Sequence, residues 1–385
     1  MKKLIATAAA SVLALATISA GDGLKVSGFI RGGLSTSLTD EVADAKHIKA
    51  GDTVIGKSWV NGKKWGGTSR ARFNTSYDGD NGGVTFRFQS DLIADNYFVN
   101  DSVKWAMAYA KFIDGMVMVE GGKLVDDYTG ADDDNGATFD GDMGLRLLVN
   151  PIEGLYIGFQ GSAFNPKYYH YDTEYVTEGS KKYDAKKARR QNNPKFDQNL
   201  FALTARYEND TLAVAAGAHF SGVFYGSFLY KGIEGLKLVA GFQAEYAGNW
   251  DSEKNVWTDA DKSSKNVLLD ATVEYNADPV LFGVVTYFYV ADDEWFAANG
   301  KGWASKVYPY VQYKLSDITA LRAEAALYIP HGYENSNLDK DMYATITPSV
   351  VFNASKKADV NVWLTISTDT EVEQHATGVG VRYNF

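Results

Sequence analysis

The segment LKLVAGFQAEY, residues 236–246, decides the fold class. Apolar residues occupy every second position, and most of the residues between them are polar or small: Leu236, Leu238, Ala240, Phe242, Ala244 and Tyr246 against Lys237, Val239, Gly241, Gln243 and Glu245. Side chains of a β-strand point alternately to its two faces, so this segment would present one apolar and one wetter face. The same alternation recurs in residues 201–208 and 360–367, and it predicts repeated β-strands.

Turn residues divide the chain into segments of ~10 residues, the length that crosses a bilayer when tilted. Short connectors such as DGDNGG (78–83), PIEG (151–154) and IEG (233–235) are hairpin signals. They alternate with long polar connectors at 37–67, 126–140, 165–198, 249–265, 292–303 and 330–342. Short turns at one end and long loops at the other are typical of outer-membrane barrels.

We therefore predict an all-β fold, a transmembrane antiparallel up-and-down β-barrel with short periplasmic turns and long external loops. Counting the segments gives about 18 strands. The alternative is 16, if the stretch around Ser221 and Gly222 does not separate two strands. A soluble β-sandwich is the other reading, but its strands would be shorter, at about five or six residues.

The first residues indicate export. Lys2 and Lys3 precede an apolar, Ala-rich run, and Ile18-Ser19-Ala20 offers small residues for cleavage. This pattern is typical of a secretory signal peptide at 1–20, which would leave 21–385 as the barrel domain. An N-terminal membrane anchor is the alternative, although the run is short for a spanning helix.

The composition agrees with a β-rich exported protein. The 385 residues include 24 Tyr, 20 Phe, 8 Trp and 37 Gly but only 7 Pro, which favours strands and tight turns. The absence of cysteine excludes disulfides and thiolate chemistry. A formal net charge of −10 argues against nucleic acid as a partner.

A barrel of this size encloses a water-filled channel. If the apolar rows face lipid, the opposite face receives arginines along the chain: Arg31, Arg70, Arg72, Arg87, Arg146 and Arg382. A charged side chain facing lipid at mid-depth would cost about 2–4 kcal/mol, so the register is well determined. Closure would place the last strand beside the first, so that Arg382, Arg31, Arg70, Arg72 and Arg87 share one wall.

The connector 126–140 is strongly acidic, with Asp126, Asp127, Asp132, Asp133 and Asp134 among its residues. If it folds into the channel, acid and base face each other across a narrow throat. Two other interpretations stay open. The arginines could pair with carboxylates such as Glu120 and Glu324 to hold the wall, and the acidic connector could be a solvated surface loop.

Three segments resemble the general diffusion porins of Gram-negative bacteria: SRARFNTSYDGDNGGVTFRFQSDL (69–92), VKWAMAYAKFIDGMVMVEGGKLVDDYTG (103–130) and the terminal GVGVRYNF (378–385). The resemblance implies that Arg31, Arg70, Arg72 and Arg87 form the basic half of a constriction and that 126–140 forms the acidic half. It further implies a homotrimer in the bacterial outer membrane. It also implies that Val379, Val381, Tyr383 and Phe385 form a terminal signal read by the barrel-assembly machinery.

The function expected is a passive diffusion channel for small hydrophilic solutes and ions, with no cofactor and no catalysis. Its other partners would be the lipid bilayer and, through the basic stretch 181–195, lipopolysaccharide. Five tyrosines fall on inward positions and suggest an alternative, a carbohydrate-preferring channel with an aromatic lane: Tyr287, Tyr289, Tyr308, Tyr310 and Tyr328. They could instead belong to the interfacial girdles.

Two further classes are less favoured. Connectors 37–67 and 165–198 are long enough for an adhesin. An outer-membrane hydrolase would need a Ser-His pair, for which only His219 and Ser221 are close in sequence. The run DDDNG at 132–136 lacks the full spacing of a calcium loop.

Overall fold

The computed structural model describes residues 23–39, 53–55, 70–91, 103–124, 143–164, 201–219, 223–245, 250–251, 256–257, 266–291, 305–329, 342–369 and 375–385. The predicted signal peptide (1–20), the acidic connector 126–140 and Ser221 lie outside the described residues, and those predictions remain untested. No helix among the described residues is long and apolar enough to cross a membrane.

Nineteen strands form one antiparallel sheet: β1 (Leu24–Ser37), β2 (Thr53–Ile55), β3 (Arg70–Gly79), β4 (Gly82–Asp91), β5 (Val103–Phe112), β6 (Val117–Lys123), β7 (Met143–Ile152), β8 (Leu155–Phe164), β9 (Phe201–Glu208), β10 (Leu212–His219), β11 (Val223–Tyr230), β12 (Leu236–Glu245), β15 (Asn266–Ala277), β16 (Val280–Ala291), β17 (Ser305–Lys314), β18 (Thr319–Ile329), β19 (Tyr343–Ser355), β20 (Ala358–Ser367) and β21 (Ala376–Asn384). The short strands β13 (Trp250–Asp251) and β14 (Val256–Trp257) pair only with each other.

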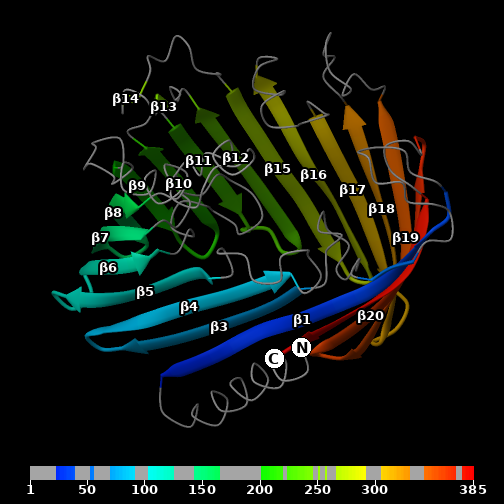
Figure 1. Cartoon of the computed structure of the whole chain (residues 1–385), viewed down its shortest axis with the longest axis horizontal. Helices are drawn as coiled ribbons and strands as arrows, with labels where there is room; N and C mark the ends of the chain where they lie inside the picture. Colours follow the sequence, from blue (N-terminus) through cyan, green and yellow to red (C-terminus); the bar gives the residue numbers. More distant parts are fainter. Residues whose placement is uncertain are drawn as a thin grey trace, which may run out of the picture.

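The sheet closes on itself. Each long strand pairs with its neighbours in chain order, and β1 pairs with both β3 and β21. Because β2 is a three-residue strand that pairs only with β1, 18 strands make the barrel and the predicted count is confirmed. Figure 1 shows them following one another around the ring, from blue through green to red. The pairing of β10 with β11 rules out the alternative of 16.

The two faces of the wall differ as the alternation predicts. On β20, Val362 and Ile366 are 47% and 46% exposed, whereas Asn361 and Trp363, which flank Val362, are 0% and 2% exposed. Large apolar side chains therefore form the outer rows, and polar side chains fill the inner rows. This arrangement suits a barrel whose outer surface meets hydrocarbon, because there every backbone group must find its partner within a closed sheet.

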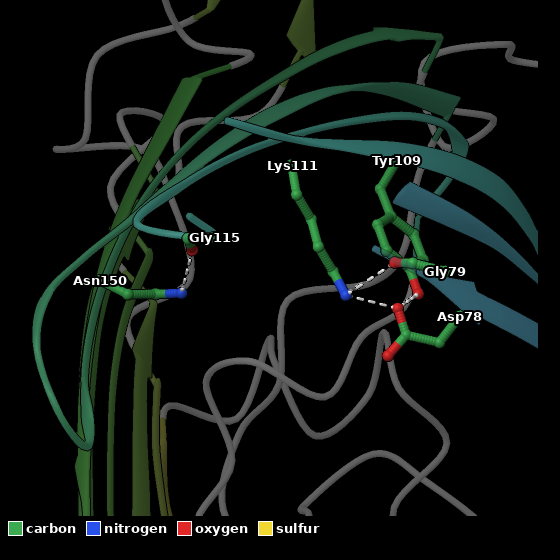
Figure 2. A network of polar contacts seen from close by, with 6 residues as sticks. All are labelled: Asp78, Gly79, Tyr109, Lys111, Gly115 and Asn150. Atoms are coloured by element: carbon green, nitrogen blue, oxygen red, sulfur yellow. Dashed lines mark hydrogen bonds and ion pairs between the residues drawn. The ribbon is translucent and has the colours of Figure 1, made fainter. Parts of the chain in front are cut away.

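The short turns are held together by polar contacts at one end of the barrel. Lys111 on β5 reaches back to the β3–β4 hairpin, where its Nζ lies 2.6 Å from Asp78 Oδ1 and 3.3 Å from the Gly79 carbonyl. The Tyr109 hydroxyl donates to the same carboxylate at 2.6 Å. Figure 2 shows these side chains converging on Asp78. These contacts hold the β3–β4 hairpin in position relative to β5 along the barrel axis.

The turn after β5 is connected to β7 in the same way. The Asn150 amide donates to the Gly115 carbonyl at 3.4 Å, and the Asn150 backbone N–H donates to the Met116 carbonyl at 2.7 Å. Figure 2 shows the Asn150 side chain meeting the turn. Ile113 and Asp114 both have φ of +53°, which is the backbone of a tight hairpin of the mirror-image type. The turns from β3 to β7 are thereby tied to one another at this end.

Closure depends on the last residue. The Phe385 backbone N–H donates to the Gly28 carbonyl at 3.1 Å, and the Gly28 N–H donates back to the Phe385 carbonyl at 3.1 Å. The Phe385 ring lies 5.3 Å from the Phe73 ring on β3. A Cβ built on Gly28 would come within 2.1 Å of the Arg72 carbonyl and 2.7 Å of the Phe385 ring. Only glycine leaves room for this junction of β1 with β21, which we call the seam.

Candidate pore-lining site

The structure brings five of the six predicted arginines together on one part of the inner face. Register pairs Arg31 on β1 directly with Arg382 on β21 and with Arg70 on β3. The other two lie on the adjoining positions of β3 and β4. We call Arg31, Arg70, Arg72, Arg87 and Arg382 the basic wall. It spans four consecutive strands of the closed barrel across the seam.

An inward phenylalanine organises the basic wall. Phe29 is 8% exposed and lies on the same face of β1 as Arg31. Three guanidinium carbons surround its ring, at 4.6 Å from the ring centroid for Arg382, 5.2 Å for Arg72 and 5.7 Å for Arg31. Each such cation–π contact contributes ~0.5–2 kcal/mol, depending on how dry it is. The ring thus brings three like charges close together.

Arg87 and Arg72 also contact neutral groups. The Arg87 guanidinium lies 3.5 Å from the centre of the Trp105 ring, and its Nε donates to Asn74 Oδ1 at 2.6 Å. Arg72 Nε donates to Gln89 Oε1 at 2.8 Å. These neutral partners orient the guanidiniums without cancelling their charge.

Two members of the wall are paired with an acid across strands: the register places Asp91 of β4 opposite Arg70 and Asp359 of β20 opposite Arg382. The Arg382 Nε donates to Asn384 Oδ1 at 2.8 Å. Asp359 bounds the basic wall on its β20 side. Beyond it, the inner row of β20 is uncharged, with buried Asn361, Trp363 and Thr365.

Arg146 lies apart from the wall. It is on β7, where its Nε lies 2.5 Å from Glu120 Oε2 on β6 and its Nη1 donates to Gln160 Oε1 at 3.3 Å. Arg146 and Glu120 are 3% and 1% exposed. A buried pair of this kind neutralises its own charge, so Arg146 matches the wall-holding interpretation and not the field of the basic wall.

The terminal row also has a clear place. Val379, Val381 and Tyr383 alternate with inward Arg382 on β21 and are 37%, 49% and 49% exposed on the outer face. The predicted acidic counterpart of the basic wall lies outside the described residues: Asp126, Asp127, Asp132, Asp133 and Asp134. The opposition of acid and base therefore stays a prediction.

Four of the five predicted tyrosines form a second inner feature, and the fifth, Tyr289, lies on β16 at the next inner position after Tyr287. Tyr287 on β16, Tyr308 and Tyr310 on β17, Tyr328 on β18 and a further residue, Tyr343 on β19, occupy inner positions of four consecutive strands; we call these five the tyrosine lane. Tyr308 contacts Tyr287 and Tyr328 edge-on, with ring centroids 6.2 and 6.3 Å apart. Tyr328 and Tyr343 stack at 4.3 Å. These rings face the interior and not the lipid girdle.

Sequence reasoning missed three residues that shape these features. Phe29 and Trp105 are apolar and were not assigned to the inner face. Phe29 lies two residues before Arg31 and therefore on the same face of the strand, which was a usable signal. Lys306 lies with its Nζ 4.4 Å from the Tyr308 ring and 4.2 Å from the Tyr328 ring. Its role depends on cross-strand register, which the local sequence SKVYPY does not reveal.

No group of three or more His, Asp or Glu side chains among the described residues could hold a metal ion. The run DDDNG (132–136) falls outside those residues. His219 lies at the end of β10, and its suggested partner Ser221 is not among the described residues. The chemistry present on the described inner face is therefore that of a polar wall: guanidiniums, carboxylates, amides and phenols.

The fold has known counterparts. No protein-family model and no curated protein matches the chain. Similar solved structures include OprB of Pseudomonas putida, at 10% identity over 94% of both chains with a TM-score of 0.50. They also include a porin mutant of Rh. blastica, at 15% identity over 94% of this chain and 100% of that one with a TM-score of 0.48. A loop deletion mutant of OmpT, an outer membrane protein of Vibrio cholerae, has 18% identity over 94% and 99%, with a TM-score of 0.48. At these identities the likeness concerns the fold alone, and the chain has the closed barrel fold of outer-membrane porins.

Proposed function

We propose that the protein is an outer-membrane porin, a passive diffusion channel for small hydrophilic solutes and ions. The observation that carries the proposal is the closed 18-strand barrel with apolar outer rows and a charged inner face. Barrels of eight strands are filled by their own side chains, whereas those of 16 to 18 strands leave an aqueous channel. Transport down a gradient requires no cofactor and no catalytic group.

The basic wall gives this channel its charge preference. Arg31, Arg72 and Arg382 gather around one ring, and their field acts in a restricted space between low-dielectric walls. Anions are attracted to such a wall and cations are repelled. The acidic connector 126–140 would oppose it and set the narrowest point, as in the porins that the sequence resembles.

The deciding experiment is reconstitution of purified protein in a planar lipid bilayer. Stepwise conductance increments, each from one inserted unit, are expected, with a reversal potential that reports ion preference under a salt gradient. Absence of any conductance step from correctly folded protein would reject the channel. A lipase and a protease assay on the same preparation test the hydrolase class, for which no activity is expected.

The assembly state and partners belong to the same proposal. We infer a homotrimer, export by cleavage after Ala20, and recognition of the C-terminal strand by the barrel-assembly machinery. Mass measurement of the detergent-solubilised protein tests the trimer, and N-terminal sequencing of membrane-derived protein tests the cleavage. Binding of lipopolysaccharide by 181–195 would be tested with a variant lacking that stretch.

A carbohydrate-preferring channel is the second candidate. One observation favours it over a purely ionic pore: the tyrosine lane faces the interior of the barrel and its rings contact one another there. Sugars stack their apolar faces on aromatic rings, so a wall of this kind retains them during passage.

A further inference from the structure

We propose that the tyrosine lane, together with Lys306, Glu274 and Arg322, is a binding site for a neutral oligosaccharide on the β15–β19 wall. The inference rests on the proposed channel function and assigns a solute class to this part of it. It depends on the register of the strands, on the geometry of the rings and on the balance of charge around them.

Register places the outermost part of the site in one row. Tyr287 pairs with Lys306, Lys306 pairs with Tyr328, and Tyr328 pairs with Tyr343. All four lie near the strand ends that lead into the long connectors 292–303 and 330–342. The row is therefore near the external mouth under the proposed orientation.

The site continues inward along β17. Tyr308 and Tyr310 follow Lys306 at successive inner positions, and such positions on a strand are about 7 Å apart. Tyr308 is half-buried, while Tyr310 is 5% exposed near the middle of the wall. The aromatic side chains thus run along the strand as well as across strands: half-buried Tyr308 offers ring surface to a ligand, and buried Tyr310 supports it from the middle of the wall.

Small residues behind the lane leave room for the rings. A Cβ built on Gly283 of β16, which pairs with Tyr310, would come within 2.4 Å of the Tyr310 Cζ and hydroxyl. The Tyr310 ring therefore lies flat over a glycine. The outward tyrosine of the same strand, Tyr313, is 46% exposed and has no part in this arrangement.

Polar groups of both kinds line the lane. The Tyr310 hydroxyl donates to Glu274 Oε2 at 2.5 Å, and Arg322 lies 5.2 Å from the Tyr310 ring while its Nη2 is 3.4 Å from Glu324 Oε2. Lys306 contributes an ammonium between two rings. Sugar hydroxyls donate and accept hydrogen bonds, so they can use such mixed partners.

The charge balance selects a neutral ligand. Lys306, Arg322 and Lys237 of β12, which pairs with Glu274, supply three cations, and Glu274, Glu324 and the buried Asp270, which pairs with Tyr287, supply three carboxylates. These charges balance, so an anionic sugar gains no net attraction here, whereas the basic wall attracts anions elsewhere in the barrel. A neutral sugar needs no such attraction and binds through its apolar face and its hydroxyls.

The test measures block of the ion current by maltohexaose in single reconstituted channels. Maltohexaose is expected to interrupt the current of the wild-type protein, and its affinity is expected to fall about tenfold in Tyr308→Ala/Tyr328→Ala because two stacking surfaces are lost. Tyr313→Ala is the matched control, since it removes an outward tyrosine from the same strand and should leave the block unchanged.

Three results would overturn the site: channels that conduct but show no sugar block, equal block in the double variant, and stronger block by an anionic oligosaccharide such as trigalacturonate. Failure of the channel itself is a separate outcome, because it appears as absent conductance. In that case, fluorescence titration of the detergent-folded barrel with maltohexaose still decides whether the site binds, and heat-modifiable mobility shows that each variant is folded.

Discussion

The basic wall and the tyrosine lane lie on the same inner face but are assembled in different ways. The basic wall joins residues from the two ends of the chain, because Arg31 meets Arg382 only when β1 pairs with β21. The tyrosine lane joins neighbouring hairpins, β16 to β19, whose pairings are all sequential. Closing a long loop carries an entropic cost that a hairpin avoids. The basic wall therefore depends on closure of the whole barrel, and the lane depends on local pairing.

The two features also act over different distances. Charge acts through space and is screened by salt, with a Debye length of about 10 Å at 0.1 M. Ring stacking requires contact and does not depend on ionic strength in this way. Separate perturbations should therefore move ion selectivity and sugar block independently.

Deletion of Phe385 should have the largest effect. It removes two backbone hydrogen bonds to Gly28 and the ring packed on Phe73, so the seam beneath the basic wall is lost. We expect folded protein in the outer membrane to fall roughly tenfold. Heat-modifiable mobility of membrane fractions measures this, with Phe385→Trp as the control that keeps a ring.

Barrels of the Phe385 deletion that do assemble should conduct normally. Wild-type amounts of folded deletion protein would contradict the role of the seam. A normal amount of protein with altered sugar block would contradict the separation of the two features.

Charge reversal in the basic wall is next in size. Arg70→Glu with Arg72→Glu should shift the reversal potential toward cations, changing the anion-to-cation permeability ratio about tenfold at 0.1 M salt and less at 1 M. Maltohexaose block should be unchanged. Lys314→Glu, near the β17–β18 turn, is the control with a single reversed charge outside the wall. Unaltered selectivity would remove these arginines from the conduction path.

Phe29→Leu tests the wall without changing its charge. The ring on which Arg31, Arg72 and Arg382 gather is lost, so the guanidiniums spread and their focused field weakens. We expect anion preference to fall about twofold, together with a lower temperature of heat modification. Phe282→Leu, on the lipid-facing row, provides the comparison. A preference that stays at the wild-type value would show that the charges alone set the field.

The sequence was sufficient for most of the fold because a single rule governs every strand. A slip by one residue would expose Arg72 or Arg322 to lipid, so alternation determines the inner face directly. The same alternation places Val379 and Tyr383 on the outer face. Strand number was predictable because turns such as 151–154 and 233–235 mark each hairpin.

The site was less predictable, since it depends on relations between strands. Parity placed Arg146 on the inner face, but only the structure shows that Glu120 pairs with it and neutralises its charge. Tyr343 joins the tyrosine lane, and Lys306 contacts it, through register alone. Phe29 was missed because an aromatic residue among apolar neighbours is usually taken as lipid-facing. Its position two residues before Arg31, which places it on the same face of the strand, would have assigned it to the inner face.

Gly283→Ala should produce the smallest effect, confined to the tyrosine lane. The new methyl group would lie where the Tyr310 ring now lies, so the ring must move and its hydrogen bond to Glu274 weakens. We expect maltohexaose affinity to fall by less than about twofold, with no change in reversal potential, because one hydrogen bond behind the lane is weakened and not lost. Gly226→Ala is the matched control, since its methyl group would meet the Phe242 ring on the outer face. If both variants changed sugar block equally, the effect would come from general strain in the barrel, and the lane would not be a separate site.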